Sequence, residues 1–129
     1  MSHRFPIRVY YEDTDMGGIV YHANYLKFIE RARSDWVREM GVDQMAMKED
    51  EGVVFAVRRV EGDYLQTARF DDRLEVCTTL QQVTGARLVL EQQVMRDDEV
   101  IFSATVTIVC ISETGYPARL PANIRLLLH

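Results

Sequence analysis

The stretch Asn24-Tyr-Leu-Lys-Phe-Ile-Glu-Arg-Ala-Arg-Ser-Asp-Trp-Val-Arg-Glu-Met-Gly41 carries the strongest structural pattern in this chain. Its apolar residues recur at helical spacing and are Tyr25, Phe28, Ile29, Ala32, Trp36, Val37 and Met40. Charged residues cover the other faces, a pattern typical of an amphipathic helix with one buried side. Asn24 suits the N-cap and Gly41 the C′ position, so the sequence predicts a long helix over residues 24–40 with both ends marked.

Two carboxylates and a glycine pair lie just before this helix, in Asp13-Thr-Asp-Met-Gly-Gly-Ile-Val-Tyr-His22. A β-branched and aromatic stretch from Phe5 to Glu12 precedes them and predicts a strand. The chain is therefore expected to pass from a strand through a tight acidic loop to a helix N-terminus. Unpaired N–H groups there, reinforced by the helix dipole, can hold a carbonyl or an oxyanion. A carboxylate facing that carbonyl is the minimal equipment for acyl transfer or acyl hydrolysis.

Four strand-like runs follow the helix, and turn residues separate them. They cover Val53 to Tyr64, Arg73 to Val83, Ala86 to Arg96 and Val100 to Ser112. The segment from Asp43 to Gly52 is expected to be partly helical, and the tail from Pro121 to Leu128 fits a short strand or a short helix. One helix cannot cover both faces of a five-stranded sheet, so the sheet must wrap around the helix or find a second sheet or protomer.

These elements predict a single α+β domain over residues 1–129. Its expected architecture is a five-stranded antiparallel sheet wrapped around a long central helix, in the order β-α-β-β-β-β. Homo-oligomerisation is a physical expectation of this arrangement, because joining two sheets edge to edge removes an unpaired edge.

Composition excludes several classes of function. The net charge of −5 argues against a nucleic-acid partner. The sequence contains no run of about eighteen apolar residues, the length needed to cross a membrane. The first residues, Met-Ser-His-Arg-Phe-Pro, do not predict a secretory signal. Cys77 and Cys110 are far apart in strand-like runs, which suits reduced thiols and a cytoplasmic protein.

Other catalytic and metal motifs are missing from the sequence. It has no Gly-x-Ser-x-Gly elbow, and neither cysteine has a histidine near it in the chain. No spacing of histidine, cysteine and acidic residues matches a metal site, so no metal is expected, and acyl hydrolysis by a carboxylate would need no other cofactor.

The segment from Tyr10 to Arg33, extending to Trp36, resembles the signature of hotdog-fold acyl-CoA thioesterases of the 4-hydroxybenzoyl-CoA thioesterase family. The strongest likeness is to the YbgC-type branch associated with the Tol-Pal envelope system. Phe70-Asp-Asp-Arg-Leu-Glu-Val76 resembles a second family segment. Two positions depart from the family pattern: Met16 replaces a small residue, which bears on acyl-chain preference, and Thr67 replaces a frequent proline.

The resemblance implies an acyl-CoA thioesterase and assigns roles to individual residues. Asp15 would be the catalytic carboxylate, as nucleophile or general base, and His22 would assist or position. Backbone N–H groups near His22 and Ala23 would polarise the thioester carbonyl. Substrate-binding positions implied in this way are Gly17, Gly18, Ala23 and Tyr25.

Simpler interpretations of the same residues stay open at this point. Asp15 could cap a turn, as acids ahead of glycines often do, and the glycines could serve only to allow positive φ angles. Asp13 is expected to stabilise the loop or cap the helix, and Tyr25 fits the helix core as well as the border of an acyl group. Four arginines are candidates for contacting the phosphates of coenzyme A or for a solvated face: Arg58, Arg59, Arg69 and Arg87.

Two other functions remain as alternatives. A hotdog-fold dehydratase or hydratase would need a paired histidine and acid, for which Asp15 and His22 are the available pair. A non-catalytic module could bind acyl thioesters or a carrier protein. The partners implied by the resemblance are acyl-CoA, a second copy of the chain in a dimer or tetramer, and an acyl carrier protein or envelope-lipid synthesis enzymes.

Overall fold

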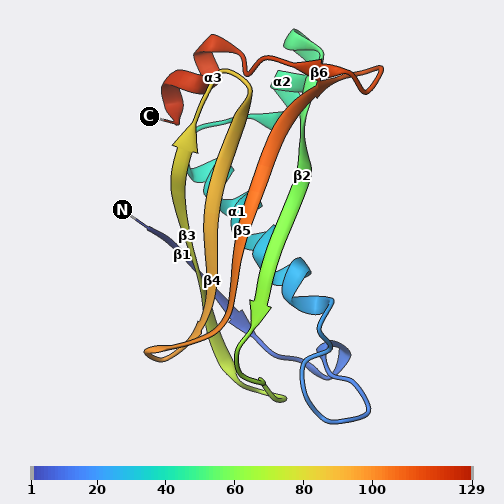
Figure 1. The fold of residues 1–129 in the computed structure, drawn as a ribbon, viewed down its shortest axis with the longest axis vertical. Coiled ribbons are helices and arrows are strands. Elements are labelled where there is room, and N and C mark those ends of the chain that lie inside the picture. The colour runs from blue at the N-terminus through green and yellow to red at the C-terminus, as the bar shows by residue number, and fades with distance from the viewer. Residues whose placement is uncertain (1, 129) are drawn as a thin grey trace.

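The computed structural model describes residues 2–128 as one antiparallel sheet with a long helix against one face (Figure 1). The strands are β1 (His3–Arg8), β2 (Val53–Tyr64), β3 (Arg73–Val83), β4 (Arg87–Arg96), β5 (Glu99–Ser112) and the two-residue β6 (Pro117–Ala118). The helices are α1 (Asn24–Glu39), α2 (Gln44–Glu51) and α3 (Ala122–Leu127), and a 3₁₀ turn forms at Tyr11–Asp13.

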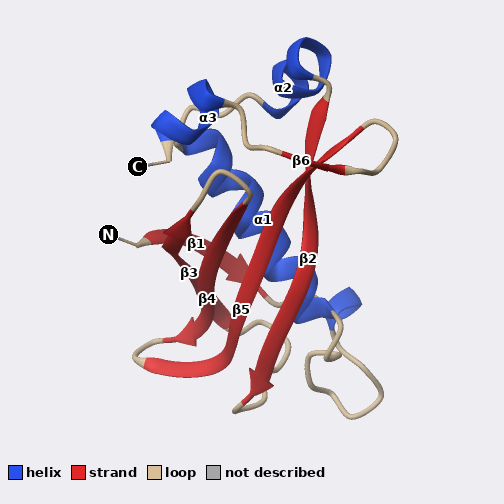
Figure 2. Ribbon diagram, turned by 45° about the horizontal axis from the view of Figure 1, so that its top comes forward, coloured by secondary structure: helices blue, strands red, loops and turns tan. Residues whose placement is uncertain are grey.

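The strand order in the sheet is β1-β3-β4-β5-β2, and all neighbouring pairs are antiparallel. Helix α1 crosses the concave face, whereas α2 and α3 lie at one end of the sheet (Figure 2). The predicted α+β class and β-α-β-β-β-β order are therefore confirmed. The short β6, which pairs with β5, is an addition that the sequence did not predict, because two residues show no periodicity.

The sheet bends around α1 (Figure 1), and its register shifts at three places. A bulge adds a residue on one strand, which bends that strand and increases its twist. The shifts lie between Val57 and Arg59, between Leu80 and Gln82, and between Val94 and Met95.

The core lies between α1 and the concave face of the sheet. Alternate residues of β4 are buried, as expected for a strand with one face against the core; they are Leu88, Leu90, Gln92 and Val94. From α1, Phe28 and Ala32 are completely buried. Burial of a large apolar side chain contributes about 1.5–3 kcal/mol, so this contact fixes the helix against the sheet.

The two predicted ends of the long helix have different outcomes. Asn24 is the first helical residue and Ala23 occupies the N-cap, so the prediction for Asn24 was wrong. Its side chain instead donates to the carbonyl oxygen of Asp13, 2.8 Å away. Gly41 does follow the helix with a φ of 88°, and the amides of Gly41 and Val42 donate to carbonyls of the last turn, as in a Schellman motif.

The first strand is shorter than the sequence predicted. It ends at Arg8, because residues 11–13 turn into a 3₁₀ helix instead of continuing the strand to Glu12. The carboxylate of Asp13 accepts a hydrogen bond from the amide of Tyr10 at 2.8 Å and stabilises this turn. At the other end of the chain, residues 122–127 are helical, which resolves the choice left open for the tail.

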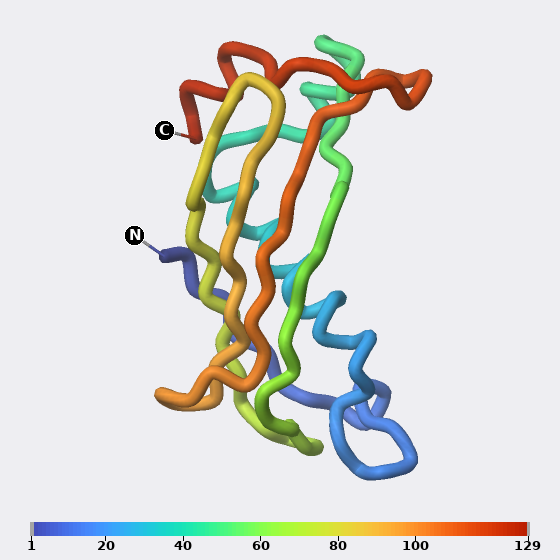
Figure 3. Tube along the Cα trace, in the orientation of Figure 1, coloured from blue at the N-terminus to red at the C-terminus, as the bar shows by residue number. Residues whose placement is uncertain are grey.

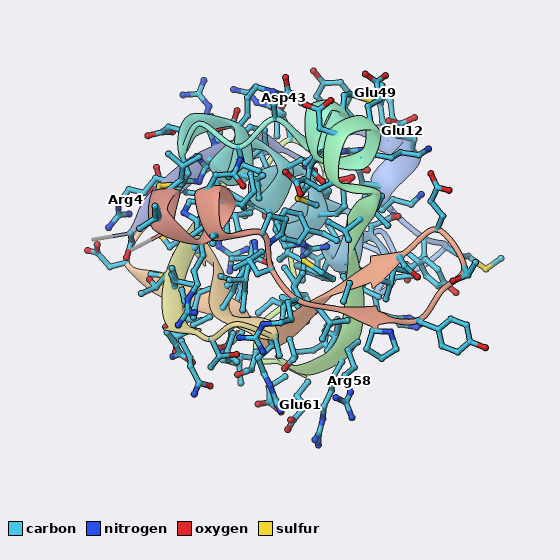
Figure 4. All side chains as sticks on the ribbon, turned by 90° about the horizontal axis from the view of Figure 1, so that it is seen from above. Arg4, Glu12, Asp43, Glu49, Arg58 and Glu61 are labelled. Carbon is cyan, nitrogen blue, oxygen red and sulfur yellow. The ribbon has the colours of Figure 1, made fainter. Side chains whose placement is uncertain are left out.

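Charged side chains mark the surface of the fold. Within residues 2–128, no helix has the length and apolar character needed to cross a membrane. The outward-pointing side chains labelled in Figure 4 are Arg4, Glu12, Asp43, Glu49, Arg58 and Glu61.

Candidate active site

The acidic loop projects from one end of the sheet and leads directly into the N-terminus of α1 (Figure 3). It closes as a small hairpin, because Thr14 and Val20 form an antiparallel bridge. The amide of Asp15 donates to the carbonyl of Ile19 at 2.9 Å, and the amide of Gly18 donates to the carbonyl of Asp15 at 3.0 Å. Backbone bonds therefore fix the position of Asp15.

The side chain of Asp15 is exposed, and only one of its two carboxylate oxygens accepts a hydrogen bond from residues 2–128. Its Oδ1 atom accepts a hydrogen bond from the amide of Gly17 at 2.8 Å, as in an Asx turn. Among residues 2–128, no group donates to Oδ2. The turn-capping interpretation of Asp15 is thus confirmed, yet it leaves one oxygen directed to solvent, so a catalytic role is compatible with it.

The two glycines of the loop serve different purposes. Gly18 has a φ of 77°, in the left-handed region that favours glycine. Gly17 has an ordinary backbone conformation, but a Cβ atom there would lie 3.2 Å from Oδ1 of Asp15. Its missing side chain therefore leaves room for the carboxylate to fold back over the turn.

The start of α1 offers two backbone donors. The amides of Asn24, Tyr25 and Leu26 donate to carbonyls of residues 21–23. The amides of His22 and Ala23, by contrast, have no protein acceptor in the described part of the chain. No acidic side chain lies in the first turn of α1, so the positive end of the helix dipole is not neutralised locally.

His22 lies on the surface at this helix start. Its ring packs against Tyr21 at a centroid distance of 4.6 Å, and its side chain makes no hydrogen bond within residues 2–128. Its carbonyl oxygen accepts a hydrogen bond from the phenol of Tyr64 at 3.0 Å. Tyr64 ends β2, so this bond fastens the helix start to the sheet. No sequence signal pointed to Tyr64.

Tyr25 is a core residue, as one of its two sequence interpretations predicted. It is 3% exposed, and its ring stacks on Phe102 at 5.1 Å and meets Tyr64 edge-on at 5.6 Å. Burial raises the pKa of the Tyr25 phenol above its ordinary value, although the nearby Arg96 partly opposes this shift. The single chain therefore exposes almost none of Tyr25 to a substrate.

Asp13 has the structural role that the sequence predicted. It is buried, its carboxylate caps the 3₁₀ turn, and its carbonyl accepts from both the amide of Tyr21 and the side chain of Asn24. The bond from Tyr21 closes the acidic loop, and the bond from Asn24 connects the loop to the first residue of α1. The carbonyl of Asp13 therefore holds the loop that carries Asp15 against the helix start.

The four arginine candidates for phosphate contact do not gather at one place. Arg69 forms a backbone bridge with Ile19, so it lies beside the acidic loop. Arg59 is paired with Glu61 at 2.9 Å, and Arg58 points outward from β2. Arg87 begins β4 next to the β3–β4 turn, at the opposite end of the sheet from the loop (Figure 1).

Comparison with known proteins identifies the family. Residues 9–127 match the family model described as the thioesterase-like superfamily. The chain belongs to this superfamily. The chain is 40% identical over 126 residues to the acyl-CoA thioesterase YbgC of Haemophilus influenzae, a match that covers 97% of the chain and 93% of the relative.

Solved thioesterase structures share the fold of this superfamily member. A probable thioesterase from Bartonella henselae is 38% identical and superposes with a TM-score of 0.89, over 94% of this chain and 100% of the other. A 4-hydroxybenzoyl-CoA thioesterase mutant complexed with 4-hydroxybenzoyl-CoA superposes with a TM-score of 0.92 over 99% of both chains, at 20% identity. The hotdog fold and the resemblance to YbgC-type thioesterases are thereby confirmed.

Proposed function

We propose that this thioesterase-like protein hydrolyses acyl-CoA to a free acid and coenzyme A, with Asp15 as its catalytic carboxylate. One observation carries the proposal: a carboxylate with an oxygen open to solvent precedes a helix start with two unpaired N–H groups. The YbgC relatives, named as acyl-CoA thioesterases, support the same reaction.

The helix start supplies the electrostatic part of the mechanism. The thioester carbonyl oxygen accepts hydrogen bonds from the amides of His22 and Ala23, which stabilise the negative charge that develops on it. Loss of one such donor costs about 3 kcal/mol in other hydrolases. The tether from Tyr64 to the carbonyl of His22 keeps these amides oriented.

Asp15 supplies the attack on the acyl carbon. As a nucleophile it forms a transient anhydride that water then hydrolyses; as a general base it takes a proton from the attacking water. In both routes the C–S bond breaks, the thiolate leaves, and the hydroxyl of water ends on the acyl carbon. His22 assists from the helix start, while Gly17 and Gly18 let the substrate approach the loop.

The second copy of the chain completes the substrate channel in this proposal. Strand β2 is the edge of the sheet, and its apolar side chains Val57 and Val60 are exposed. A groove between α1 and β2 is lined by these residues and Leu26. Because an exposed twelve-residue edge is a ready template for pairing, two β2 edges join into one dimer sheet, and the pantetheine arm lies between the protomers.

Further features of the substrate and setting belong to the same proposal. Arg69, beside the loop, is the candidate contact for the phosphates of coenzyme A. The enzyme works in the cytoplasm, where thiols such as Cys77 and Cys110 stay reduced. Association of dimers into tetramers and a link to envelope-lipid synthesis follow from the YbgC likeness and are expectations only.

Thiol release from short, long and aromatic acyl-CoAs tests the reaction. We expect Asp15→Asn to lower kcat by at least a hundredfold on every substrate that the wild type accepts. Glu12→Gln is the matched control, because it removes an exposed acid near the loop and should leave kcat within twofold. Circular dichroism and light scattering check that both variants keep the fold and the oligomer.

Equal thiol release by the wild type and Asp15→Asn would refute the assigned carboxylate. No release from any acyl-CoA, with release from the same acyl groups on a carrier protein, would instead identify the carrier protein as the substrate. No release from either carrier would contradict the thioesterase proposal. Ultraviolet absorbance of an enoyl-CoA would then test the hydratase alternative.

A further inference from the structure

A histidine and two carboxylates meet where β1 contacts α1, away from the acidic loop. His3 begins β1, whereas Asp35 and Glu39 lie one turn apart on α1. The Nε2 atom of His3 lies 2.8 Å from Oδ2 of Asp35 and 3.2 Å from Oε2 of Glu39. Asp35 is about 16 Å along the helix from Asn24, at a rise of about 1.5 Å per residue, so this cluster is separate from the candidate active site.

Burial differs sharply among the three side chains. The side chain of His3 is 6% exposed, so its ring is held in place, whereas that of Glu39 is 70% exposed. The two carboxylates can therefore adjust around a fixed imidazole nitrogen. Water can reach the same point from the side of Glu39.

The charges of the cluster are unbalanced. Two carboxylates separated by four residues on a helix repel each other, and one imidazole proton is shared between them. Among residues 2–128, the further positive group within 4.0 Å of these carboxylates is the exposed guanidinium of Arg38, whose Nη1 lies 4.0 Å from Oδ1 of Asp35. A divalent cation at Nε2 would satisfy both carboxylates at once.

The distances fit a small tetrahedral cation. Zinc bonds of about 2.0 Å place neighbouring ligand atoms about 3.3 Å apart. The separations of 2.8 and 3.2 Å from Nε2 to the two carboxylate oxygens need to open by a few tenths of an ångström. The two carboxylate oxygens lie within 4.8 Å of each other, so the exposed Glu39 carboxylate has to move to complete the tetrahedron. An imidazole nitrogen with two carboxylate oxygens suits zinc-class ions, whereas magnesium and calcium prefer oxygen alone.

The second ring nitrogen of His3 limits how tightly such an ion is held. Its Nδ1 atom is buried and has no hydrogen-bond partner in the described part of the chain. A metal at Nε2 moves the ring proton to Nδ1, where no acceptor stabilises it, although metal-bound histidines ordinarily donate this proton. Binding is therefore expected to be reversible.

We propose that His3, Asp35 and Glu39 form an exchangeable binding site for a zinc-class divalent cation, which fastens the edge strand β1 to α1. Local spacing did not predict this site, because His3 is 32 residues from Asp35 and only the contact of β1 with α1 brings them together. Occupancy would stabilise the β1 edge without touching the acidic loop.

Titration of the untagged protein with zinc chloride, by calorimetry and by thermal unfolding, tests this site. We expect one zinc per chain and a rise in Tm. His3→Asn should weaken binding at least tenfold, and Asp35→Asn with Glu39→Gln should do the same. Arg38→Gln should bind several times more tightly, since it removes a competing positive charge. His22→Asn and Glu51→Gln are controls that should bind as the wild type does.

Three results would overturn the proposal. They are the absence of a zinc-dependent change in the wild type, unchanged binding in His3→Asn, and equal stabilisation by magnesium. If His3→Asn does not fold, cobalt absorption spectra of the wild type and Arg38→Gln decide. A tetrahedral spectrum that forms at lower cobalt concentration in Arg38→Gln supports the site, and equal spectra in the two proteins contradict it.

Discussion

The phenol of Tyr64 donates a hydrogen bond to the carbonyl oxygen of His22, at a distance of 3.0 Å. These residues are 42 positions apart, and the bond joins the end of β2 to the start of α1. Tyr64 also packs on Phe102 and Tyr25 beneath the helix start. One side chain therefore couples the edge strand to the backbone donors of the candidate site.

Tyr64→Phe keeps this packing and removes only the hydrogen bond. An exposed hydrogen bond contributes about 0.5–1.5 kcal/mol, so the free energy of unfolding should fall by no more than that. We expect kcat to fall about tenfold, because the amides of His22 and Ala23 lose their orientation, with KM nearly unchanged. Steady-state thiol release, with Tyr116→Phe as an exposed control, measures this effect. Unchanged kcat would show that the tether is dispensable.

The polar side chain of Gln92 is completely buried in the core. It accepts from Arg33 at 2.9 Å and donates to the carbonyl of Ile29 and the hydroxyl of Thr78. Gln92→Met would leave these groups without partners, including a half-buried guanidinium. We expect the protein to lose about 2–4 kcal/mol of stability in urea denaturation, more than an ordinary core substitution of similar size costs.

Gln93→Met is the matched control for that substitution. Gln93 is the next residue of β4, lies half-buried on the other face of the sheet, and makes no side-chain hydrogen bond within residues 2–128. Its replacement should change the free energy of unfolding by less than about 0.5 kcal/mol. Similar losses in the two variants would mean that the network around Gln92 contributes nothing specific.

The proposed dimer can be tested at the free edge of β2. The double variant Val57→Lys and Val60→Lys places two charges where two sheets should join. We therefore expect it to be a monomer in light scattering. Its kcat/KM should fall at least tenfold, because the channel needs both protomers. Leu126→Lys introduces a charge at an exposed apolar residue of α3 and should leave mass and activity unchanged. A double variant that stays dimeric would place the interface elsewhere.

Cys110 gives the protein a defined sensitivity to alkali. Burial raises the pKa of its thiol from 9.0 to about 11. The folded state therefore holds this proton more tightly than the unfolded state does, so the associated stability is present below pH 9 and is lost as the pH rises through about 11. We expect Cys110→Ala to lose less stability than the wild type between these pH values in urea denaturation.

Cys77→Ala provides the comparison for the alkaline experiment. Burial raises the pKa of Cys77 as well, but this side chain is only half-buried and Arg4 opposes the shift. Its removal should flatten the pH dependence less than Cys110→Ala does. The reverse order would contradict the assignment of the effect to Cys110.

Local patterns predicted the elements of the fold well, because apolar residues recur regularly along the helix and the long strands. The ranges of β2 and β3 match the predicted residues at both ends, and Gly41 ends the helix as expected. The first strand was predicted too long, because a hydrogen bond from Tyr10 to Asp13 turns the chain although its residues favour a strand. Asn24 was assigned as a cap since sequence cannot show that its side chain reaches back to Asp13.

The candidate site was only partly predictable, because some of its contacts join residues that are far apart in the sequence. Asp15, His22 and the glycines lie within one continuous segment, so a motif could identify them. Tyr64 joins them through tertiary contact alone, and the partners of Gln92 come from two other elements, α1 and β3. Such contacts depend on sheet register and on the path of α1, which no local pattern encodes.

The hairpin that carries Asp15 is closed by main-chain bonds, and the side chain of Met16 at its tip is fully exposed. Among residues 2–128, no contact depends on the side chain of Met16, in contrast to the two glycines that follow it. Evolution, or a saturation library, can therefore alter what an incoming acyl group meets there without a folding penalty. If the proposed function holds, a single codon at Met16 can change substrate preference while the carboxylate of Asp15 beside it stays constant.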